Sequence, residues 1–184
     1  MSNHPFKVGV VTVSDRAYQG VYEDLGGPAV LAWLAAAVVS PMKTVSRIVP
    51  DERRQIEEVL VQLADRERCH LILTTGGTGP AKRDVTPDAT VAVAERVLEG
   101  FGERMRSIGL QYVPTAILSR QVGAIRGKSL IVNLPGKPKA IKETLDDLFA
   151  AIPDCIQLID GPIVETNPEI VVAYRPHSPN RSQP

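Results

Sequence analysis

The stretch Leu71 to Asp84, LILTTGGTGPAKRD, decides how the rest of the chain is interpreted. It begins with branched apolar residues, the pattern of a strand buried on both faces, and three glycines follow within a few residues. Glycine accepts positive φ and has no Cβ, so successive backbone N–H groups can converge on an anion such as a phosphate. Two cations, Lys82 and Arg83, precede the carboxylate of Asp84, which can bind a divalent metal. The stretch therefore predicts a nucleotide or phosphoester site at the end of a strand.

A tight turn is the plainest alternative for glycines after a strand, and for this loop alone it would carry about half the weight. The loop matches neither of the two commonest phosphate motifs. The dinucleotide fingerprint G-x-G-x-x-G opens a helix, whereas GGTGPA has Pro80 and Ala81 in the wrong places. The P-loop needs four residues before Gly-Lys-Ser, whereas GAIRGKS at 123–129 has three and precedes a strand.

One domain is the simplest organisation for 184 residues, and we expect it to cover 1–184 with a proline-rich tail from about residue 162. Lysine plus arginine equal aspartate plus glutamate at 21 each, which excludes a general basic surface for nucleic acid or anionic membrane. The longest apolar run, Ala29 to Val39, is too short to span a bilayer, and the first residues lack a signal-peptide pattern. Cys69 and Cys155 lack zinc-site spacing and are typical of reduced thiols. We therefore expect a cytoplasmic protein without nucleic-acid or membrane partners.

Apolar runs and turn signals divide the chain into alternating strands and helices. Strands are predicted at Phe6 to Val13, Lys43 to Val49, Leu71 to Leu73, Gln121 to Ile125 and Ser129 to Val132, the last two as a hairpin. Helices are predicted from Pro28 to Val39, around Ile56 to Leu63, from Ala89 to Leu98 with Thr86 as cap, from Glu103 to Leu110 after a break at Gly100 and Gly102, from Lys139 to Phe149 and from Cys155 to Leu158. The alternation predicts a three-layer α/β/α sandwich with a mostly parallel sheet, in which the hairpin allows one antiparallel strand.

Polar side chains follow several of the predicted strands. Asp15, Asp51 and Asp84 each follow one of the first three, and Asn133 follows a later one. Parallel strands end at one edge of a sheet, where ligands bind, so all four residues are predicted to lie on one rim. Carboxylates around a phosphate loop repel one another unless a cation lies between them. Mg²⁺ suits this role because it takes oxygen ligands from one or two carboxylates and the substrate phosphates.

Each of these acids also has a structural alternative. Asp51 could be only a helix N-cap, Asp15 could cap a turn, and Asp88 is more typical of a favourable helix-dipole interaction than of catalysis. Asp84 has no evident capping role. No histidine follows a strand towards the rim, so the pattern favours alignment and charge neutralisation of phosphates over general-base catalysis.

Further polar residues occur in the predicted loops near the rim. Ser119 and Arg120 lie in one loop and Lys137 and Lys139 in another. An arginine and two lysines on one rim would suit a second phosphate group. Solvated surface charge is an equally weighted alternative for them.

With these segments the chain resembles the molybdopterin adenylyltransferases, the MogA-like proteins of molybdenum cofactor biosynthesis. The resemblance extends from about residue 8 to residue 170 and is carried by VSDRAYQGVYEDLGGPA, IVPDE, HLILTTGGTGPAKRDVTPDAT, FGERMR, VPTAILSRQVG, LIVNLPGKPK and PDCIQLIDGP followed by VETNPE. TTGGTG alone is shared with related domains, including those of molybdenum insertases and a competence-associated family. The segment after 143–145 is shorter than in some relatives.

The resemblance implies a trimer that transfers AMP from MgATP to the terminal phosphate of molybdopterin, releases pyrophosphate and passes the product to a molybdenum insertase. By matching position, Asp51 and Asp84 would be the catalytic and Mg²⁺-binding carboxylates. The implied nucleotide and pterin pocket comprises Ser14, Asp15, Thr75, Gly76, Gly77, Thr78, Gly79, Asn133, Pro135 and Gly136, with Ser119 and Arg120 towards the molybdopterin phosphate. A molybdopterin carrier or trimeric scaffold, and a nucleotide-pyrophosphate hydrolase like the competence-associated relatives, are the competing functions.

Overall fold

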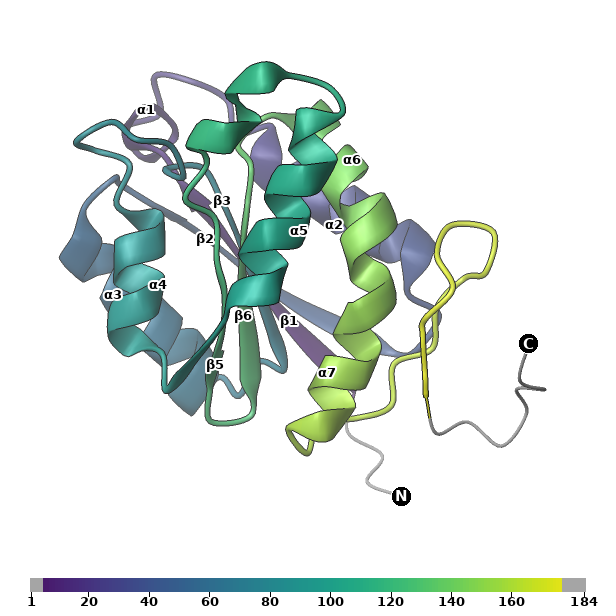
Figure 1. The fold of residues 1–184 in the computed structure, drawn as a ribbon. Helices are drawn as coiled ribbons and strands as arrows, with labels where there is room; N and C mark the ends of the chain where they lie inside the picture. Colours follow the sequence, from purple (N-terminus) through teal and green to yellow (C-terminus); the bar gives the residue numbers. More distant parts are fainter. Residues whose placement is uncertain (1–4, 177–184) are drawn as a thin grey trace.

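A six-stranded sheet runs through the middle of the computed structural model, which describes residues 5–176 (Figure 1). Along the chain its strands are β1 (Phe6–Val13), β2 (Met42–Val49), β3 (Leu71–Thr75), β4 (Arg96–Leu98), β5 (Gly123–Arg126) and β6 (Ser129–Leu134). Their order across the sheet is β2-β1-β3-β6-β5-β4. The strands β2, β1, β3 and β6 are parallel, and β5 is antiparallel to both of its neighbours. The predicted mostly parallel sheet, with an antiparallel strand in the hairpin, is confirmed.

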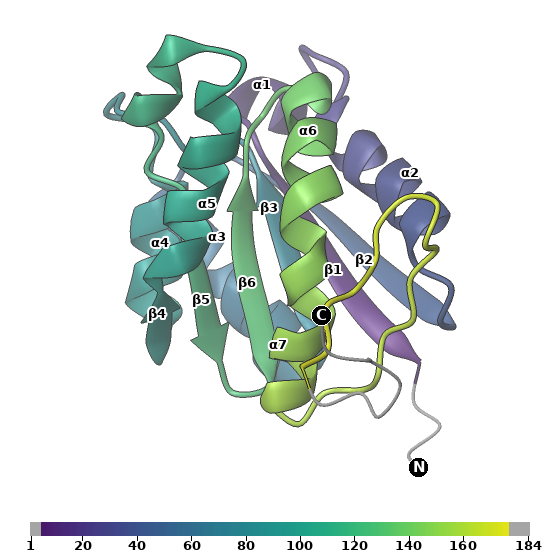
Figure 2. The same cartoon turned by 45° about the vertical axis from the view of Figure 1, so that its right-hand side comes forward.

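Helices cover both faces of the sheet (Figures 1 and 2). One face carries α3 (Arg53–Val61) and α4 (Thr86–Val93), and the other carries α2 (Gly26–Ala37), α5 (Glu99–Leu110), α6 (Pro138–Leu148) and α7 (Ile152–Leu158). Shorter turns are α1 (Asp15–Tyr18), the π-helical η1 (Gln62–Arg66) and the 3₁₀ segments η2 (Pro114–Leu118) and η3 (Phe149–Ala151). The predicted three layers are therefore present.

The β1 strand shows how the sequence builds two cores from one sheet. Val8 and Val10 join the buried cluster under α2, α5 and α6, whereas Val11 and Val13 join the cluster under α3 and α4. Successive side chains of a strand point to opposite faces, so a continuous apolar run suits a strand that is covered on both sides. Each fully buried valine contributes about 1.5–3 kcal/mol relative to an exposed one.

The α2 helix has no charged residue along its whole length. Its buried face packs on the sheet through Val30 and Leu34, and Trp33 donates a hydrogen bond from Nε1 to Asp146 Oδ1 of α6 at 2.7 Å. The chain beyond α7 packs against the C-terminal end of α2, where Val38, the residue after the helix, pairs with Thr166 in an isolated bridge. Within residues 5–176, no helix is both long enough and apolar enough to cross a bilayer.

Two expectations for residues 86–110 are wrong. The predicted helix from Ala89 to Leu98 ends at Val93, because the backbone becomes extended at Ala94 and Glu95 donates to Ile125 O at 2.8 Å, which begins the edge strand β4. The second wrong expectation is that Gly100 and Gly102 break the helix, since both lie within α5 (Glu99–Leu110). Gly102 lies inside α5, where a Cβ would be only 2.6 Å from Gln121 O, so its lack of a side chain permits close packing.

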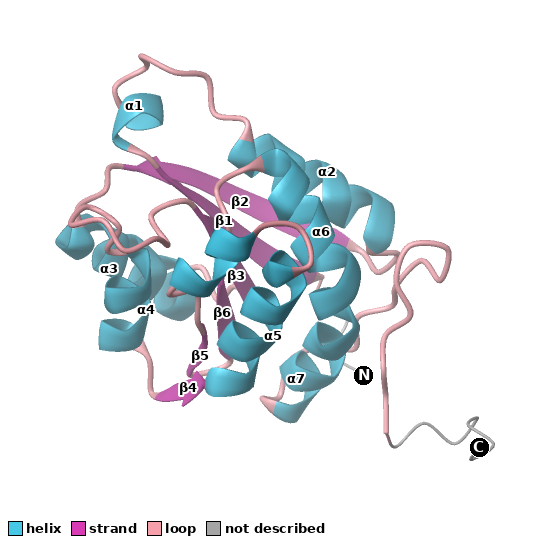
Figure 3. Ribbon diagram, turned by 45° about the horizontal axis from the view of Figure 1, so that its top comes forward, coloured by secondary structure: helices cyan, strands magenta, loops and turns pink. Residues whose placement is uncertain are grey.

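The carboxyl ends of the parallel strands meet at the edge of the sheet that Figure 3 turns towards the viewer. Strand pairing places Val13 beside Val49 and Thr75 beside Leu134. The segments that leave the strands there, including α1 and the glycine-rich loop after β3, are therefore neighbours in space. The loops that carried the predicted site residues lie at this rim.

Candidate functional site

Asp15 and Asp51, which follow β1 and β2, hold each other in place by reciprocal hydrogen bonds. The backbone N–H of Asp15 donates to Asp51 Oδ2 at 2.8 Å, and that of Asp51 donates to Asp15 Oδ1 at 3.0 Å. The N-cap of α3 is Glu52, so the alternative in which Asp51 serves only as a helix cap is wrong. Ser14 is a cap instead, since its Oγ accepts from the N–H of Ala17 at the start of α1.

Arg83 ties this aspartate pair to the chain that follows β3. Its Nε donates to Asp15 Oδ2 at 2.8 Å, and its Nη2 donates to Asp15 Oδ1 and Glu52 Oε1, both at 2.9 Å. The hydrogen-bonded guanidinium lowers the pKa of the Asp15 carboxyl below its usual range. The same two carboxylates raise the pKa of Arg83. Arg83 thus fixes the side of the site formed by β1 and β2.

The glycine loop, Gly76 to Gly79, depends on backbone geometry that other residues adopt with strain. Gly76 and Gly77 have φ values of +97° and +62°, and a Cβ on Gly76 would lie 2.3 Å from Val13 O. Thr86 anchors the loop, donating from N–H to Gly77 O at 3.1 Å and from Oγ1 to Gly76 O at 3.0 Å. The expectation that Thr86 is an N-cap is wrong, since the cap position of α4 is Val85 and no side chain bonds there.

Asp51 and Asp84 both reach the glycine loop. A Cβ built on Gly77 would lie 3.2 Å from Asp51 Oδ1, and one built on Gly79 would lie 2.8 Å from Asp84 Oδ2. The N–H of Ala81 donates to Asp84 Oδ2 at 2.9 Å. The other oxygen of Asp84 and Oδ1 of Asp51 accept no hydrogen bond from residues 5–176. The structure therefore brings the two carboxylates to one loop and leaves an oxygen of each available.

The electrostatics at Asp51 are unfavourable for an ionised carboxylate. Burial raises the pKa of Asp51, and the charges of Asp15 and Asp84 raise it further, whereas the hydrogen bond from Asp15 and the charge of Arg83 lower it. Burial and like charges both disfavour the ionised form. A cation near Asp51 and Asp84 would relieve this repulsion.

Asp51→Asn is expected to raise the melting temperature of the metal-free protein at neutral pH. A carboxyl whose pKa is higher in the folded than in the unfolded chain destabilises the fold once it is ionised, and this penalty is absent below the unfolded-state pKa. The gain should therefore vanish as the pH falls below the usual range of aspartate. Thermal unfolding with a chelator present measures it.

Asp15→Asn is the control for Asp51→Asn, because it should change the melting temperature in the opposite direction. Arg83 lowers the pKa of Asp15, so ionised Asp15 stabilises the fold above the unfolded-state pKa, and this stabilisation is lost as the pH falls through the lower folded-state pKa. The variant should melt at a lower temperature at neutral pH. Equal shifts of the same sign in both variants would contradict this account.

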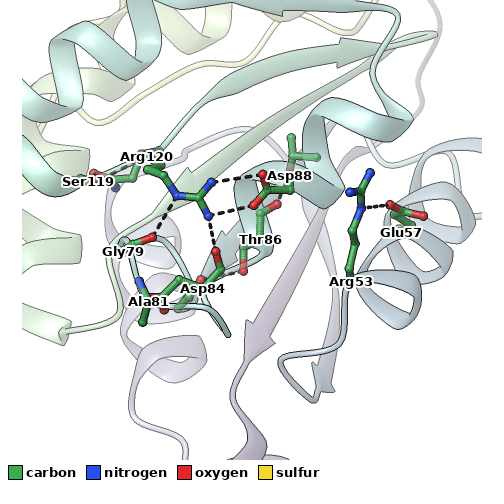
Figure 4. A network of polar contacts seen from close by, with 12 residues as sticks. Arg53, Glu57, Gly79, Ala81, Asp84, Thr86, Asp88, Ser119 and Arg120 are labelled. Carbon is green, nitrogen blue, oxygen red and sulfur yellow. Dashed lines mark hydrogen bonds and ion pairs between the residues drawn. The ribbon is translucent and has the colours of Figure 1, made fainter.

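Arg120, which the resemblance places towards the molybdopterin phosphate, bonds to the glycine loop and to α4 in this structure (Figure 4). Its guanidinium pairs with Asp88 of α4, from Nη1 to Oδ1 at 3.1 Å and from Nη2 to Oδ2 at 2.8 Å. Nε also donates to Gly79 O at 3.0 Å, and Nη2 donates to the backbone carbonyl of Asp84. The bonded guanidinium lowers the pKa of Asp88, so this acid has a specific partner beyond the helix dipole.

Asn133 lies beneath the rim and not on it. It is fully buried in β6, and its Nδ2 donates to Thr74 Oγ1 at 3.0 Å and to Thr90 Oγ1 at 2.8 Å. Its side chain borders neither of the two cavities near the glycine loop. Thr90 Oγ1 in turn donates to Thr86 O, so Asn133 belongs to a buried polar network that supports the start of α4.

Gly136 and Lys137 border two cavities near the glycine loop. The first, of about 340 Å³, is lined by the predicted residues Ser14, Thr75, Gly76 and Gly136. The second, of about 460 Å³, is lined by the predicted residues Thr78, Gly79, Ser119, Pro135 and Gly136. The remaining predicted residues, Asp15, Asp51, Gly77, Asp84, Arg120 and Asn133, line neither cavity.

Asp24 is a cavity-lining residue that the strand-end pattern did not select. It lines the first cavity, accepts from Thr12 Oγ1 at 2.7 Å and accepts from the N–H groups of Gly26 and Gly27 at 3.0 and 3.1 Å. An acid two residues before a Gly-Gly-Pro helix start is a recognisable capping signal. The strand-end pattern did not select it, because Asp24 follows α1 and not a strand.

The described residues contain no group of three or more His, Cys, Asp or Glu side chains that could hold a metal ion. Two carboxylates, with substrate phosphates and water as the other ligands, are a common donor set for Mg²⁺. The available oxygens of Asp51 and Asp84, together with the raised pKa of Asp51, fit such a site.

Comparison with known families and proteins gives a consistent result. Residues 9–154 match the family described as "Probable molybdopterin binding domain". The molybdopterin adenylyltransferase of Escherichia coli K12 is 56% identical over 187 residues, covering 95% of this chain and 96% of the relative. The molybdopterin adenylyltransferase of Helicobacter pylori 26695 is 52% identical over 169 residues, covering 92% and 96%.

Solved structures have the same fold. The molybdopterin biosynthesis enzyme MoaB from Thermus thermophilus superposes with a TM-score of 0.78 at 42% identity, covering 86% of this chain and 99% of that one. The molybdopterin biosynthesis Mog protein from Mycobacterium ulcerans gives a TM-score of 0.75 at 38% identity, covering 83% and 98%.

Proposed function

This chain belongs to the molybdopterin binding domain family, and from that premise we propose that it is a molybdopterin adenylyltransferase. It would transfer AMP from MgATP to the terminal phosphate of molybdopterin. A phosphate oxygen of molybdopterin attacks the α-phosphorus of ATP, and the bond to the β-phosphate oxygen breaks to release pyrophosphate. The observation that carries the proposal is the meeting of Asp51 and Asp84 at a glycine loop bordered by two cavities.

The glycine loop is suited to binding phosphate. The backbone N–H groups of Gly76, Gly77, Thr78 and Gly79 donate no hydrogen bond to another described residue. Successive free amides in a turn with positive φ form a concave site for an anion. Two separate cavities beside such a loop allow two phosphorylated substrates to meet there, one in each.

Asp51 and Asp84 are the residues that would hold Mg²⁺. When bound, the ion neutralises phosphate charge and allows two anionic substrates to approach. The nucleophile is already an anionic oxygen, so the protein needs to align the reactants more than it needs a general base. The backbone N–H of Asp15 holds Asp51 Oδ2, Arg83 holds the carboxylate of Asp15, and Asp51 Oδ1 is left beside the glycine loop.

The test is an assay of purified protein with molybdopterin, ATP and Mg²⁺. We expect pyrophosphate release that requires all three components, with adenylylated molybdopterin formed in equal amount. Tight pterin binding that is indifferent to ATP would instead identify a carrier, and consumption of ADP-ribose without pterin would identify a hydrolase. Absence of molybdopterin-dependent pyrophosphate release from a folded sample would overturn the proposal.

The proposal extends to a single domain over 1–184, a cytoplasmic location, transfer of the product to a molybdenum insertase and a homotrimer.

One surface is suited to subunit contact in such a trimer, because the outer face of α2 exposes only apolar residues, namely Pro28, Ala32, Ala35 and Ala36. Such a helix face is usually covered. Light scattering should give three times the chain mass of 19.9 kDa, and a monomer at micromolar concentration would contradict the trimer.

A further inference from the structure

The side chain of Arg120 spans both ends of the segment from Gly79 to Asp84. It donates to the carbonyl oxygens of both end residues, and its own backbone N–H donates to Thr78 O at 2.9 Å. Asp88 holds the guanidinium from the other side through both of its carboxylate oxygens. Figure 4 shows the guanidinium between the carboxylate of Asp88 and the two loop carbonyls.

These contacts leave little capacity for a ligand. Of the five N–H donors of a guanidinium, four are used by Gly79, Asp84 and Asp88. Neither Arg120 nor Asp88 borders either cavity. With four of its donors bonded to the protein, the guanidinium of Arg120 is placed to act on the loop.

We propose that the Arg120–Asp88 ion pair is a positioning device for Asp84. Apart from Arg120, two restraints hold the segment from Gly79 to Asp84: the bonds of Arg83 to Asp15 and Glu52, and a local turn in which Asp84 bonds to Ala81 through both its backbone N–H and its side chain. Arg120 fixes that turn to the segment following η2, and Asp88 keeps Arg120 in the required orientation. The inference rests on the proposed function, because Asp84 is its metal-binding carboxylate.

The effect should appear in geometry more than in global stability. Both side chains of the pair are 40% exposed, and an ion pair with this exposure contributes little to folding. A misplacement of about 1 Å at a reacting centre, by contrast, can lower a rate about a hundredfold. Loss of the pair should therefore leave a folded protein with a badly placed Asp84.

The chain offers a matched control in the Arg104–Asp147 pair. It joins α5 to α6 with the same two-pronged geometry, and its side chains are 48% and 42% exposed. Asp147→Asn removes the same charge from an equally exposed arginine pair, but at residues that contact neither the glycine loop nor Asp84.

Asp88→Asn should lower turnover about ten- to a hundredfold and raise the Mg²⁺ concentration for half-maximal activity, with an unchanged KM for molybdopterin. Asp88→Glu, which keeps the charge, should recover most of the rate. Arg120→Lys should behave like Asp88→Asn, because one ammonium group cannot reach both loop carbonyls and the carboxylate. A role in stability alone would reduce the amount of folded enzyme without changing its Mg²⁺ dependence.

Amide exchange in the ligand-free protein tests the positioning role without any turnover. The N–H groups of Ala81, Asp84 and Arg120 are hydrogen-bonded across this segment, and their exchange should accelerate about tenfold or more in Asp88→Asn but not in Asp147→Asn. Equal exchange and equal kinetics in the two variants would overturn the inference. An inactive wild-type protein would refute the proposed adenylyltransferase function. The exchange comparison would still decide whether the Arg120–Asp88 pair holds the segment from Gly79 to Asp84.

Discussion

Asp84→Asn is expected to lower molybdopterin-dependent pyrophosphate release by about a hundred- to a thousandfold, the scale that follows when a group stabilising transition-state charge is lost. Asparagine has the same shape and can still accept the hydrogen bond from Ala81, so the turn should survive. The variant removes only the negative charge at the glycine loop. Asp84 is half-buried and forms no ion pair in residues 5–176, so removing its charge breaks no ion pair of the fold, although it does remove one of the charges that raise the pKa of Asp51.

A steady-state pyrophosphate assay, with circular dichroism to establish folding, measures this effect. Asp65→Asn is the control for removing an aspartate charge away from the rim, because Asp65 lies on η1 and pairs with Arg126 of β5. It should retain nearly full activity. If Asp84→Asn turned over within threefold of the control, Asp84 would have no role in the chemistry.

The sheet and its rim could be predicted from the sequence because both follow from local patterns. Short runs rich in β-branched residues and bounded by turn signals, such as the one at Phe6–Val13, are typical of buried strands. Once the strands are parallel, the polar residues after them must meet at one edge. Asp15, Asp51 and Asp84 meet for this reason, although they lie 36 and 33 residues apart along the chain.

The failures arise where a distant contact overrides a local preference. Residues 96–98 read as the end of a helix, yet β5 offers them an edge to pair with, and they become β4. The loop position of Arg120 did not indicate that Asp88 and two loop carbonyls take up four of its donors. Asn133 is at the right end of its strand, but its side chain lies on the buried face, where Thr74 and Thr90 contact it.

Gly76→Ala should combine a large loss of stability with a loss of activity. The Cβ would lie 2.3 Å from Val13 O, and φ at this position is +97°, which alanine adopts with strain. A flexible side chain cannot relieve this overlap, because the obstructing atom belongs to the backbone of β1. We expect a decrease of roughly 3 kcal/mol or more in the free energy of unfolding, the range for substitutions that combine steric overlap with backbone strain.

Gly20→Ala separates the two causes. Gly20 also has a positive φ, +72°, but no atom lies within 4 Å of its Cβ position, so only the backbone strain of about 1 kcal/mol applies there. Urea denaturation of both variants gives the difference, which should be about 2 kcal/mol on these estimates. Relieving the overlap requires the glycine loop to move away from β1 and therefore from Asp51, so the fraction of Gly76→Ala that folds should also turn over slowly. Equal destabilisation by both substitutions would mean that the loop can shift without cost, and the fixed placement of Asp51 and Asp84 around it would then lose its physical basis.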